Sequence, residues 1–278
     1  MKIVFVGHVC VDRNVIRGES EVFYGGGVLQ GAVTAKRVGA DATVLTKCAE
    51  ADRHHYCMSL VQAGVETIFL PSQTTTSIQN VYPSENPDDR QSTLVSRAAP
   101  FALADLETVA ADVVHLNPLW FGEFPADLLP ALKPRTPLLA GDAQGFLRHA
   151  EAAGKMVHRD LEDKREVLRL FDVFKVDSKE AKILTGLEDI RLAAHAVRGL
   201  GPRVVILTHR DGVCVFDGHD YYESPFTSFT LEGRTGRGDT CTAAFLVGMS
   251  RMNLADATAF AAEVTSRKMQ YRGPYRGY

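Results

Sequence analysis

Four short apolar runs decide the fold class, and they read Val113-Val114-His115-Leu116, Pro137-Leu138-Leu139-Ala140, Val173-Phe174-Lys175-Val176 and Val204-Val205-Ile206-Leu207. Stretches with the apolar spacing of helices lie between or beside them, at 125–132, 161–170, 178–185 and 189–199. Short apolar runs that alternate with helices favour a mostly parallel sheet with helices on both faces. We therefore predict an α/β fold of three layers.

The first hundred residues extend this pattern and add a region of different character. Their spacing predicts strands at 2–11, 42–46 and 67–70 and helices at 28–38 and 54–63, with Asp12 at the end of the first strand. Residues 72–98 are instead rich in Ser, Thr, Asn and Gln, and strand-like pieces at 77–82 and 92–95 flank a loop at 85–90. This pattern predicts an antiparallel hairpin that stands off the main core, which the polar piece at 15–23 could join.

The end of the chain completes the expected domain. An antiparallel hairpin at 213–216 and 221–223 is followed by helices at about 239–249 and 254–271. The chain has no repeats and no long linker. We expect a single domain, 1–278, with a small β lid formed by insertions at about 13–24 and 73–97.

Composition excludes several classes of partner. The chain has 278 residues, 45% of them hydrophobic, and 31 Lys+Arg against 34 Asp+Glu give a net charge of −3 at pH 7. Nucleic acid is not an expected partner, because phosphate binding needs concentrated basic surface. No apolar run is long enough for a membrane span, and the apolar start of the chain is too short for a signal peptide. Five cysteines without a CxxC pair indicate a reduced, cytoplasmic protein.

The sharpest local motif is Gly236-Arg237-Gly238-Asp239, which stands directly before good helix formers. Glycines let backbone N–H groups point into one space, and the start of a helix adds partial positive charge. An aspartate inside such an anion cradle could take the proton of a substrate hydroxyl during phosphoryl transfer. The alternative is that Asp239 only caps the helix.

A second motif is Gly25-Gly26-Gly27, at the entrance of the helix expected at 28–38. Consecutive glycines permit close approach of a ligand, although a plain turn explains them equally well. The motif is not a dinucleotide fingerprint, because that would follow the first strand directly, near Gly7. The Walker pattern GxxxxGK[ST] is absent from the sequence.

Four motifs together resemble the PfkB (ribokinase-like) family of carbohydrate kinases along nearly the whole chain. The family's N-terminal pattern, a Gly-Gly pair and a helix that ends in Arg-Leu-Gly, corresponds to residues 25–39. Its C-terminal pattern, Asp-Thr-x-Gly-Ala-Gly-Asp, corresponds to residues 233–239. Its Asn-x-x-Glu segment and its nucleotide-binding Thr-x-Gly-x-x-Gly turn resemble residues 177–186 and 207–212. The four motifs stand in the family's order and spacing.

The resemblance implies a kinase that uses ATP and Mg²⁺ and has a ribokinase-like fold. Asp239 would be the catalytic base, and the amides of Gly236, Arg237 and Gly238 would form the anion hole. Glu180 would help to hold Mg²⁺ with its waters. The residues expected on the ATP side are Asp177, Thr208 and Gly212.

The resemblance also implies which residues meet the acceptor. Asp12 would accept hydrogen bonds from substrate hydroxyls, and Gly26 and Gly27 would pack against the substrate. The lid would exclude water, so that the donor is not hydrolysed. Gln30 stands where many sugar kinases of the family have an Asn that contacts the substrate, so either the pocket or the contacted hydroxyl should differ.

Three other departures from the family pattern leave alternatives open. Arg237 replaces the usual Ala, and its guanidinium could touch phosphate or point outward. Asp177 replaces the usual Asn, and could attract Mg²⁺ or form a salt bridge. Gly233 replaces the first Asp of the C-terminal motif. None of these changes removes a group that the chemistry needs.

The acceptor is expected to be a small polyhydroxy compound. Asn117-Pro118, residues 142–148 and residues 97–100 look similar to the myo-inositol kinase branch of the family, so a cyclic polyol or sugar comes first, with myo-inositol leading. Asp142 and Gln144 could contact it or only cap a strand end. The alternatives are a nucleoside kinase of the same family and a non-catalytic polyol- or nucleotide-binding homologue. A homodimer through the lid and a monomer are both compatible with the sequence.

Overall fold

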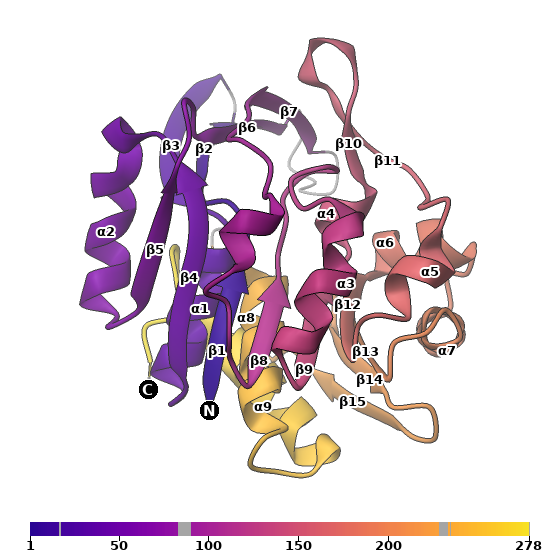
Figure 1. Ribbon diagram of the computed structural model, residues 1–278. Helices are drawn as coiled ribbons and strands as arrows, with labels where there is room; N and C mark the ends of the chain where they lie inside the picture. The colour runs from indigo at the N-terminus through magenta and orange to yellow at the C-terminus, as the bar shows by residue number, and fades with distance from the viewer. Residues whose placement is uncertain (17, 83–89, 228–232, 234, 278) are drawn as a thin grey trace.

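The large sheet carries the strands that the sequence predicts. The computed structural model describes residues 1–16, 18–82, 90–227, 233 and 235–277. Among these residues a nine-stranded sheet has the order β15-β14-β13-β12-β9-β8-β1-β4-β5 (Figure 1). All neighbours from β5 to β13 pair in parallel, and β14 and β15 add an antiparallel edge. The strands are β1 (Lys2–Val6), β4 (Asp41–Cys48), β5 (Glu66–Pro71), β8 (Val113–Leu116), β9 (Leu138–Asp142), β12 (Val173–Asp177), β13 (Val204–Thr208), β14 (Gly212–Phe216) and β15 (Tyr221–Pro225).

Helices cover both faces of this sheet, because alternate residues of each strand point to opposite sides. In β1, Phe5 joins one apolar cluster, whereas Val4 and Val6 join the other. The first cluster lies under α1 (Gly27–Arg37), α2 (Arg53–Gln62), α8 (Arg237–Gly248) and α9 (Leu254–Lys268). The second lies under α3 (Leu129–Leu132), α4 (Gln144–Leu147), α5 (Lys164–Leu168), α6 (Ser178–Thr185) and α7 (Ile190–Arg198). Figure 1 shows α3 in front of the sheet and α9 behind it, so the predicted three-layer architecture is confirmed.

A second, smaller sheet stands at one end of the large one. Its order is β3-β2-β6-β7, from β2 (Cys10–Ile16), β3 (Glu19–Gly25), β6 (Thr76–Tyr82) and β7 (Gln91–Ser96). The pair β6 and β7 is antiparallel, as predicted, and β2 joins it in parallel. Residue 17 and most of the predicted loop at 85–90 lie outside the described residues.

The first predicted strand, 2–11, is wrong in one respect that affects the site. The chain leaves the large sheet after Val6, and β2 starts a new strand in the small sheet at Cys10. At Gly7 the backbone lies so close to Asn117 that a Cβ would be 2.4 Å from the Asn117 carbonyl oxygen. Asp12 is therefore not the end of strand one but part of the small sheet.

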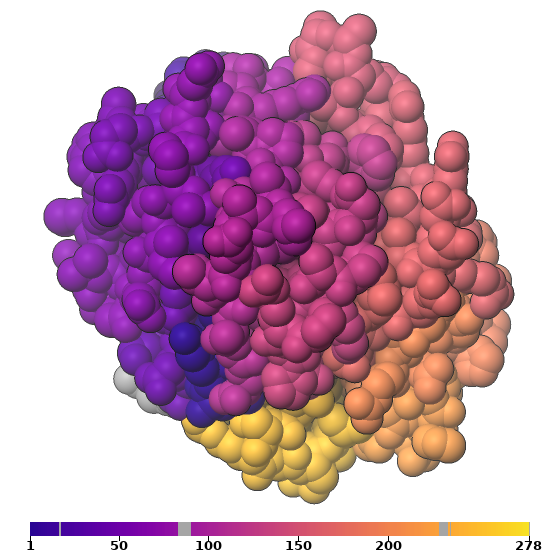
Figure 2. Space-filling view, in the orientation of Figure 1, coloured from indigo at the N-terminus to yellow at the C-terminus, as the bar shows by residue number. Residues whose placement is uncertain are grey.

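Smaller differences occur between residues 148 and 170. The sequence analysis missed a short hairpin of β10 (Arg148–Ala150) and β11 (Met156–His158). Its turn uses positive φ at Ala153 (59°) and Gly154 (79°). The connection between the two strands protrudes from the surface in Figure 2. The helix predicted at 161–170 is shortened to α5.

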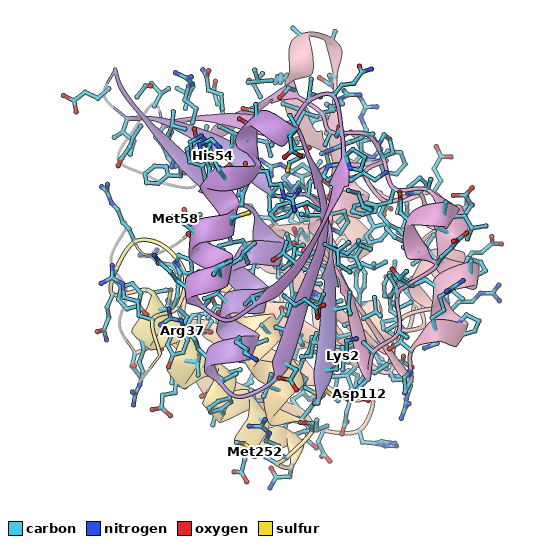
Figure 3. The ribbon with its side chains drawn as sticks, turned by 60° about the vertical axis from the view of Figure 1, so that its left-hand side comes forward. Lys2, Arg37, His54, Met58, Asp112 and Met252 are labelled. Carbon is cyan, nitrogen blue, oxygen red and sulfur yellow. The ribbon has the colours of Figure 1, made fainter. Side chains whose placement is uncertain are left out.

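The two ends of the parallel strands differ in character. At the amino-terminal end, the backbone N–H of Lys2 donates to the Asp112 carboxylate at 2.8 Å, and the two residues lie side by side in Figure 3. The opposite end carries the polar side chains described below. Among the described residues, no helix is both long and apolar enough to cross a membrane.

Candidate active site

Polar side chains gather where four neighbouring parallel strands end. Asn117 directly follows β8, and Asp142, Asp177 and Thr208 are the last residues of β9, β12 and β13. These strands are adjacent in the sheet, with Lys175 opposite Asp142 and Asp177 opposite Thr208. Ligands of open α/β sheets bind at the carboxyl ends of the strands. The predicted substrate and donor residues of these strands therefore share one edge.

The start of α8, which holds the residues expected to form the anion cradle, lies over this edge. Gly236 is the N-cap in the left-handed region (φ 82°), and the helix begins at Arg237. The first N–H groups of a helix have no partner within it, so they are available to an anion. A Cβ on Gly238 would lie 3.0 Å from the Lys175 ammonium nitrogen, which places that cation directly against the cradle. Asp239 does not cap α8, so the capping alternative is wrong.

Asp239 is held by Asn117 instead. The Asn117 amide Nδ2 donates to Asp239 Oδ1 at 2.7 Å, across 122 positions of sequence. The start of α1 closes on this pair, because a Cβ on Gly27 would lie 2.1 Å from Asn117 Oδ1 and 2.6 Å from Asp239 Oδ1. Gly26 adopts a φ of +109°, and a Cβ there would meet the His8 carbonyl oxygen at 2.8 Å. The glycines thus make room for the predicted base and its partner.

The surroundings of Asp239 make its carboxylate a better proton acceptor. Burial raises the pKa of Asp239, and the nearby charge of Asp142 raises it further. The hydrogen bond from Asn117 and the charge of Lys175 lower the pKa of Asp239 and so oppose this rise. A general base is most effective when its pKa approaches the working pH, so a raised value suits that role.

A buried ion triad lies beneath the cradle. The Lys175 ammonium is 3.1 Å from Asp142 Oδ2 and 3.5 Å from Glu180 Oε2, and all three side chains are buried. Burial alone would lower the pKa of Lys175, but the charges of Asp142 and Glu180 raise it overall, so the lysine stays charged. Burial and the neighbouring Asp177 raise the pKa of Glu180, and the charge of Lys175 opposes this rise. Lys175 was not predicted as a site residue, although a lysine inside the apolar run VFKV is a signal for it.

Asp177 and Glu180 also build the start of α6. The Glu180 backbone N–H donates to Asp177 Oδ1 at 2.8 Å, and the Asp177 N–H donates to Glu180 Oε2 at 2.6 Å. This reciprocal pair is a capping box, which stabilises the helix start. Asp142 has a comparable local role, because its Oδ1 accepts the Gln144 N–H at 2.9 Å. The strand-end capping considered for Asp142 is therefore present, together with its ion pair to Lys175.

The small sheet brings a second carboxylate to the site, and β10 brings a second cation. Asp12 is half-buried in β2, and burial raises the pKa of its carboxyl, as does the charge of Asp239. The guanidinium of Arg148, which is buried at the start of β10, lowers the pKa of Asp12. The charge of Glu180 in turn favours the protonated form of Arg148. Asp12 and Asp239 therefore belong to one electrostatic site, to which Arg148 of β10 contributes through Asp12. Arg148 was not singled out from the sequence.

The remaining predicted residues have local packing roles. The Arg237 guanidinium lies 5.8 Å from the centre of the Phe226 ring. Gln30 is buried in α1 against the cradle, since a Cβ on Gly236 would be 2.8 Å from its side-chain amide. Thr208 is buried, and Gly212 is packed so closely on β15 that a Cβ would meet the Ser224 carbonyl oxygen at 2.5 Å.

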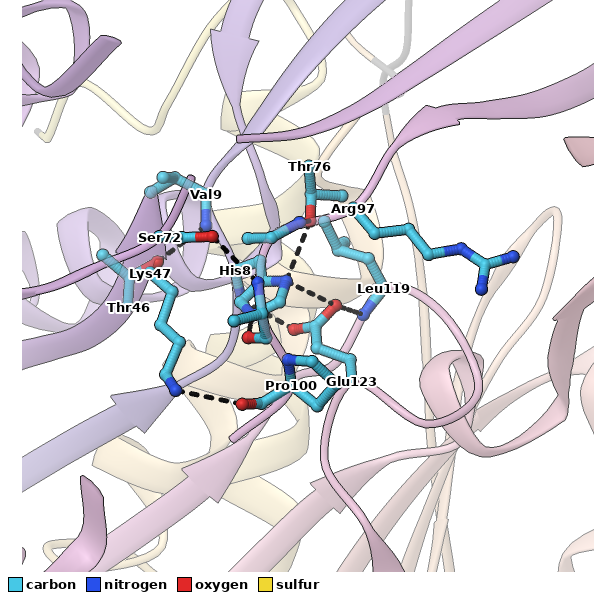
Figure 4. Close-up of polar contacts among 12 residues, drawn as sticks. His8, Val9, Thr46, Lys47, Ser72, Thr76, Arg97, Pro100, Leu119 and Glu123 are labelled. Atoms are coloured by element: carbon cyan, nitrogen blue, oxygen red, sulfur yellow. Dashed lines mark hydrogen bonds and ion pairs between the residues drawn. The ribbon is translucent and has the colours of Figure 1, made fainter. Parts of the chain in front are cut away.

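A buried polar junction joins the two sheets behind the site (Figure 4). His8 follows β1, and its Nδ1 lies 2.8 Å from Thr76 Oγ1 at the start of β6. Glu123 accepts the backbone N–H groups of His8 at 2.6 Å and of Leu119 at 2.8 Å. Because Leu119 stands two residues after Asn117, this junction connects the small sheet to the loop that holds Asp239.

Comparison with known proteins then identifies the family. The profile described as pfkB family carbohydrate kinase matches residues 2–277. The chain belongs to this family. It is therefore a phosphotransferase whose acceptor is a hydroxyl group, and its ribokinase-like fold is confirmed.

Three relatives show where the chain lies within the family. A pyrophosphate-dependent kinase of the ribokinase family, solved with a pyrophosphate analog and myo-inositol, is 48% identical, with 99% of this chain and 97% of that chain covered and a TM-score of 0.94. A pyrophosphate-dependent myo-inositol-1 kinase converted by mutation into a myo-inositol-3 kinase is 47% identical, with 99% and 95% covered and a TM-score of 0.92. A cytidine kinase of Thermococcus kodakarensis is 26% identical over 90% of this chain and 89% of its own length.

Proposed function

We propose that this kinase transfers a phosphoryl group from pyrophosphate to one hydroxyl of a cyclic polyol, with myo-inositol as the first candidate. The observation that carries the proposal is the Asn117–Asp239 pair at the start of α8, with Lys175 against the cradle. It combines a base with raised pKa, the backbone amides at the start of a helix and a buried cation at one edge of the sheet. That combination suits an acceptor hydroxyl on one side and an anionic donor on the other.

The chemistry follows from these positions. Asp239 would take the proton of the acceptor hydroxyl as its oxygen forms the new bond to phosphorus and the bridging P–O bond of the donor breaks. The amides of Gly236, Arg237 and Gly238 would stabilise the negative charge on the transferred group. The small sheet would act as the lid over the site and exclude water. Asp12 would orient the acceptor from the lid side.

The residues present also fit a magnesium ion. Mg²⁺ usually keeps several waters and uses only one or two carboxylates together with substrate phosphates. Glu180 lies beside Lys175 and Asp177, and it would hold the ion through such waters. The described residues contain no set of three or more His, Cys, Asp or Glu side chains placed to hold a metal alone. When bound, Mg²⁺ would neutralise donor charge.

Pyrophosphate is preferred to ATP as donor for two reasons. The relatives that are 47–48% identical over nearly the whole chain are pyrophosphate-dependent. The Lys175 ammonium against the cradle and the Arg148 guanidinium, which interacts with Asp12 and Glu180, match a donor that consists only of phosphate groups. The resemblance places Gly212 beside the nucleotide, but its close packing against β15 is enough to explain why this position is a glycine. ATP, with Asp177, Thr208 and Gly212 on its side, is the alternative donor.

The acceptor assignment rests on the polar groups around the base. Asp12, Asp142, Gln144 and Gln30 offer acceptors and amide groups of the kind that a ring of hydroxyls would satisfy. Gln30 Oε1 is buried without a hydrogen-bond partner among the described residues, so it has a free acceptor beside Gly236. The second candidate is a nucleoside acceptor, favoured only by the 26% identical cytidine kinase.

A matrix of donors and acceptors tests the proposal. Purified protein with Mg²⁺ receives pyrophosphate or ATP, each with myo-inositol, ribose, fructose, cytidine or adenosine, and phosphorus NMR identifies the product. We expect an inositol monophosphate, formed at least about tenfold faster from pyrophosphate than from ATP, a difference of about 1.4 kcal/mol in transition-state stabilisation. Faster turnover with ATP overturns the donor, and a phosphorylated nucleoside as main product overturns the acceptor. Binding of a polyol without transfer from either donor supports the non-catalytic homologue.

A further inference from the structure

Lys268, the last residue of α9, is a buried cation outside the set of residues that the mechanism uses. Its side chain is fully buried, although lysine is among the residues that are rarely buried without a partner. Its Nζ donates to the Gly233 carbonyl oxygen at 2.6 Å and to the carbonyl oxygen of Thr235. Both acceptors belong to the stretch that leads into Gly236.

The end of α9 holds this stretch in other ways as well. The Thr227 N–H donates to Ser266 Oγ of α9 at 3.0 Å. A Cβ on Gly233 would lie 1.9 Å from the Met269 carbonyl oxygen, so any side chain at 233 would displace the backbone. This contact explains why glycine replaces the aspartate of the family pattern at position 233. Thr227 and Gly233, which stand on either side of residues 228–232, are thus both fastened to α9.

The contact with Thr235 affects the cradle directly. A peptide group is planar and trans, so the carbonyl of Thr235 and the N–H of Gly236 point in opposite directions. When Lys268 draws that carbonyl oxygen toward α9, the Gly236 N–H must face away from α9. Gly236 is the N-cap of α8, and its N–H is one of the donors proposed for the anion hole.

We propose that Lys268 is a positioning residue for the kinase, which orients the Gly236 amide of the anion cradle and places a fixed positive charge behind it. This inference rests on the proposed role of the cradle in donor binding. Burial lowers the pKa of Lys268 to about 8, while the charge of Asp239 favours its protonated form. The ammonium and the catalytic carboxylate are therefore within electrostatic reach of each other.

Lys47 provides a matched control in the same chain. It is also buried, and its Nζ bonds a backbone carbonyl, that of Pro100, at 2.9 Å, with Asp105 as ion-pair partner at 2.6 Å. It lies near the end of β4 and contacts the segment that follows β7, not the cradle (Figure 4). Lys268→Met and Lys47→Met therefore remove comparable buried hydrogen bonds at two different places.

Calorimetric titration with pyrophosphate and Mg²⁺, and separately with myo-inositol, measures each variant. We expect Lys268→Met to weaken pyrophosphate binding by about 10- to 100-fold, the range for loss of a charge-assisted hydrogen bond, and to leave myo-inositol binding within about twofold. Added ammonium or methylammonium ions, but not sodium, should restore part of the affinity and of the transfer rate. Lys47→Met should keep pyrophosphate affinity and show no response to ammonium.

The results separate this inference from the proposed function. Unchanged pyrophosphate affinity in Lys268→Met, with only a lower melting temperature, overturns the positioning role. If Lys268→Met does not fold, Lys268→Gln takes its place, because its amide can donate to only one of the two carbonyl oxygens and carries no charge. Wild-type pyrophosphate affinity in that variant overturns the proposed role of the positive charge behind the cradle. If the wild-type protein binds pyrophosphate but transfers nothing, the proposed function fails while the binding comparison still decides the role of Lys268.

Discussion

At Asp239, two groups of effects compete for the proton affinity of one carboxyl group. Burial and the charge of Asp142 raise its pKa, and the Asn117 amide and Lys175 oppose them. Asn117 is the only one of these partners that both contacts the carboxylate and leaves the ion triad intact when it is replaced. It therefore offers a direct way to change the base without changing the cradle.

Asn117→Ala should move the acid limb of the pH profile of kcat/KM to higher pH. The variant loses a hydrogen bond that favours the carboxylate form, so the pKa of Asp239 rises further and more of the base is protonated at a given pH. The rate at neutral pH should also fall by about tenfold, because the carboxylate loses its orientation. The measurement is kcat/KM between pH 4 and 9. Asn253→Ala, which removes a hydrogen bond at the start of α9, is the control. An acid limb at the wild-type position in Asn117→Ala would contradict the assignment.

At the scale of elements, the loop after β8 is fastened by Glu123 to the chain that leaves β1. Burial raises the pKa of Glu123 to about 8, and burial lowers the pKa of His8 to about 3. Relative to ordinary values of 4.5 and 6.5, both groups are therefore favoured in their uncharged forms. The junction between the two sheets is a neutral hydrogen-bonded unit at moderately acid pH.

The two groups give opposite dependences of stability on pH. Between about pH 4.5 and 8 the folded protein holds the Glu123 proton and the unfolded chain does not, so the free energy of unfolding falls as pH rises through this interval. Between about pH 3 and 6.5 the unfolded chain protonates His8 and the folded protein does not, so stability falls as pH falls. Both windows follow from a raised carboxyl pKa and a lowered imidazole pKa.

Glu123→Gln should remove the first of these dependences. Glutamine keeps a carbonyl oxygen for the backbone donors but does not titrate, so the wild-type stability relative to the variant should decline from pH 5 to 8. Urea unfolding at several pH values measures it, with Glu107→Gln at an exposed site as control. Glu123→Ala, which leaves buried N–H groups of His8 and Leu119 unsatisfied, should cost about 1–3 kcal/mol per group. A parallel pH dependence in wild type and Glu123→Gln would refute the interpretation.

The periodicity of the sequence predicted the bounds of helices and strands well where those bounds depend only on neighbouring residues. The strand at 113–116 and the helix at 178–185 have the predicted bounds, because one is a buried apolar run and the other has its own capping box. The strand predicted at 2–11 failed because both halves are apolar, while the break at Gly7 comes from Asn117, a residue far along the chain. The hairpin of β10 and β11 was not predicted, because each of its strands has only three residues.

On the scale of the whole molecule, the candidate site exists only because the fold brings distant segments together. Asp239 meets Asn117 across 122 positions, and Thr34 of α1 meets Thr240 of α8 across 206. Motifs identified the glycines and Asp239 because they resemble a family pattern. Lys175, Arg148 and Lys268 carry no such motif, since their roles depend on which strand ends and carbonyls surround them. These contacts are tertiary, so no local pattern contains them.

The central claim is that Asp239 removes the acceptor proton in a cradle that binds the donor independently of it. The direct measurement compares phosphoryl transfer from pyrophosphate to myo-inositol by wild type and Asp239→Asn in single turnover, with calorimetric binding of each ligand alongside. We predict a loss of about 10²- to 10⁴-fold in the transfer rate, the usual contribution of a general base, with both ligands still bound within a few fold of the wild-type affinity. Transfer by Asp239→Asn at close to the wild-type rate would contradict this claim.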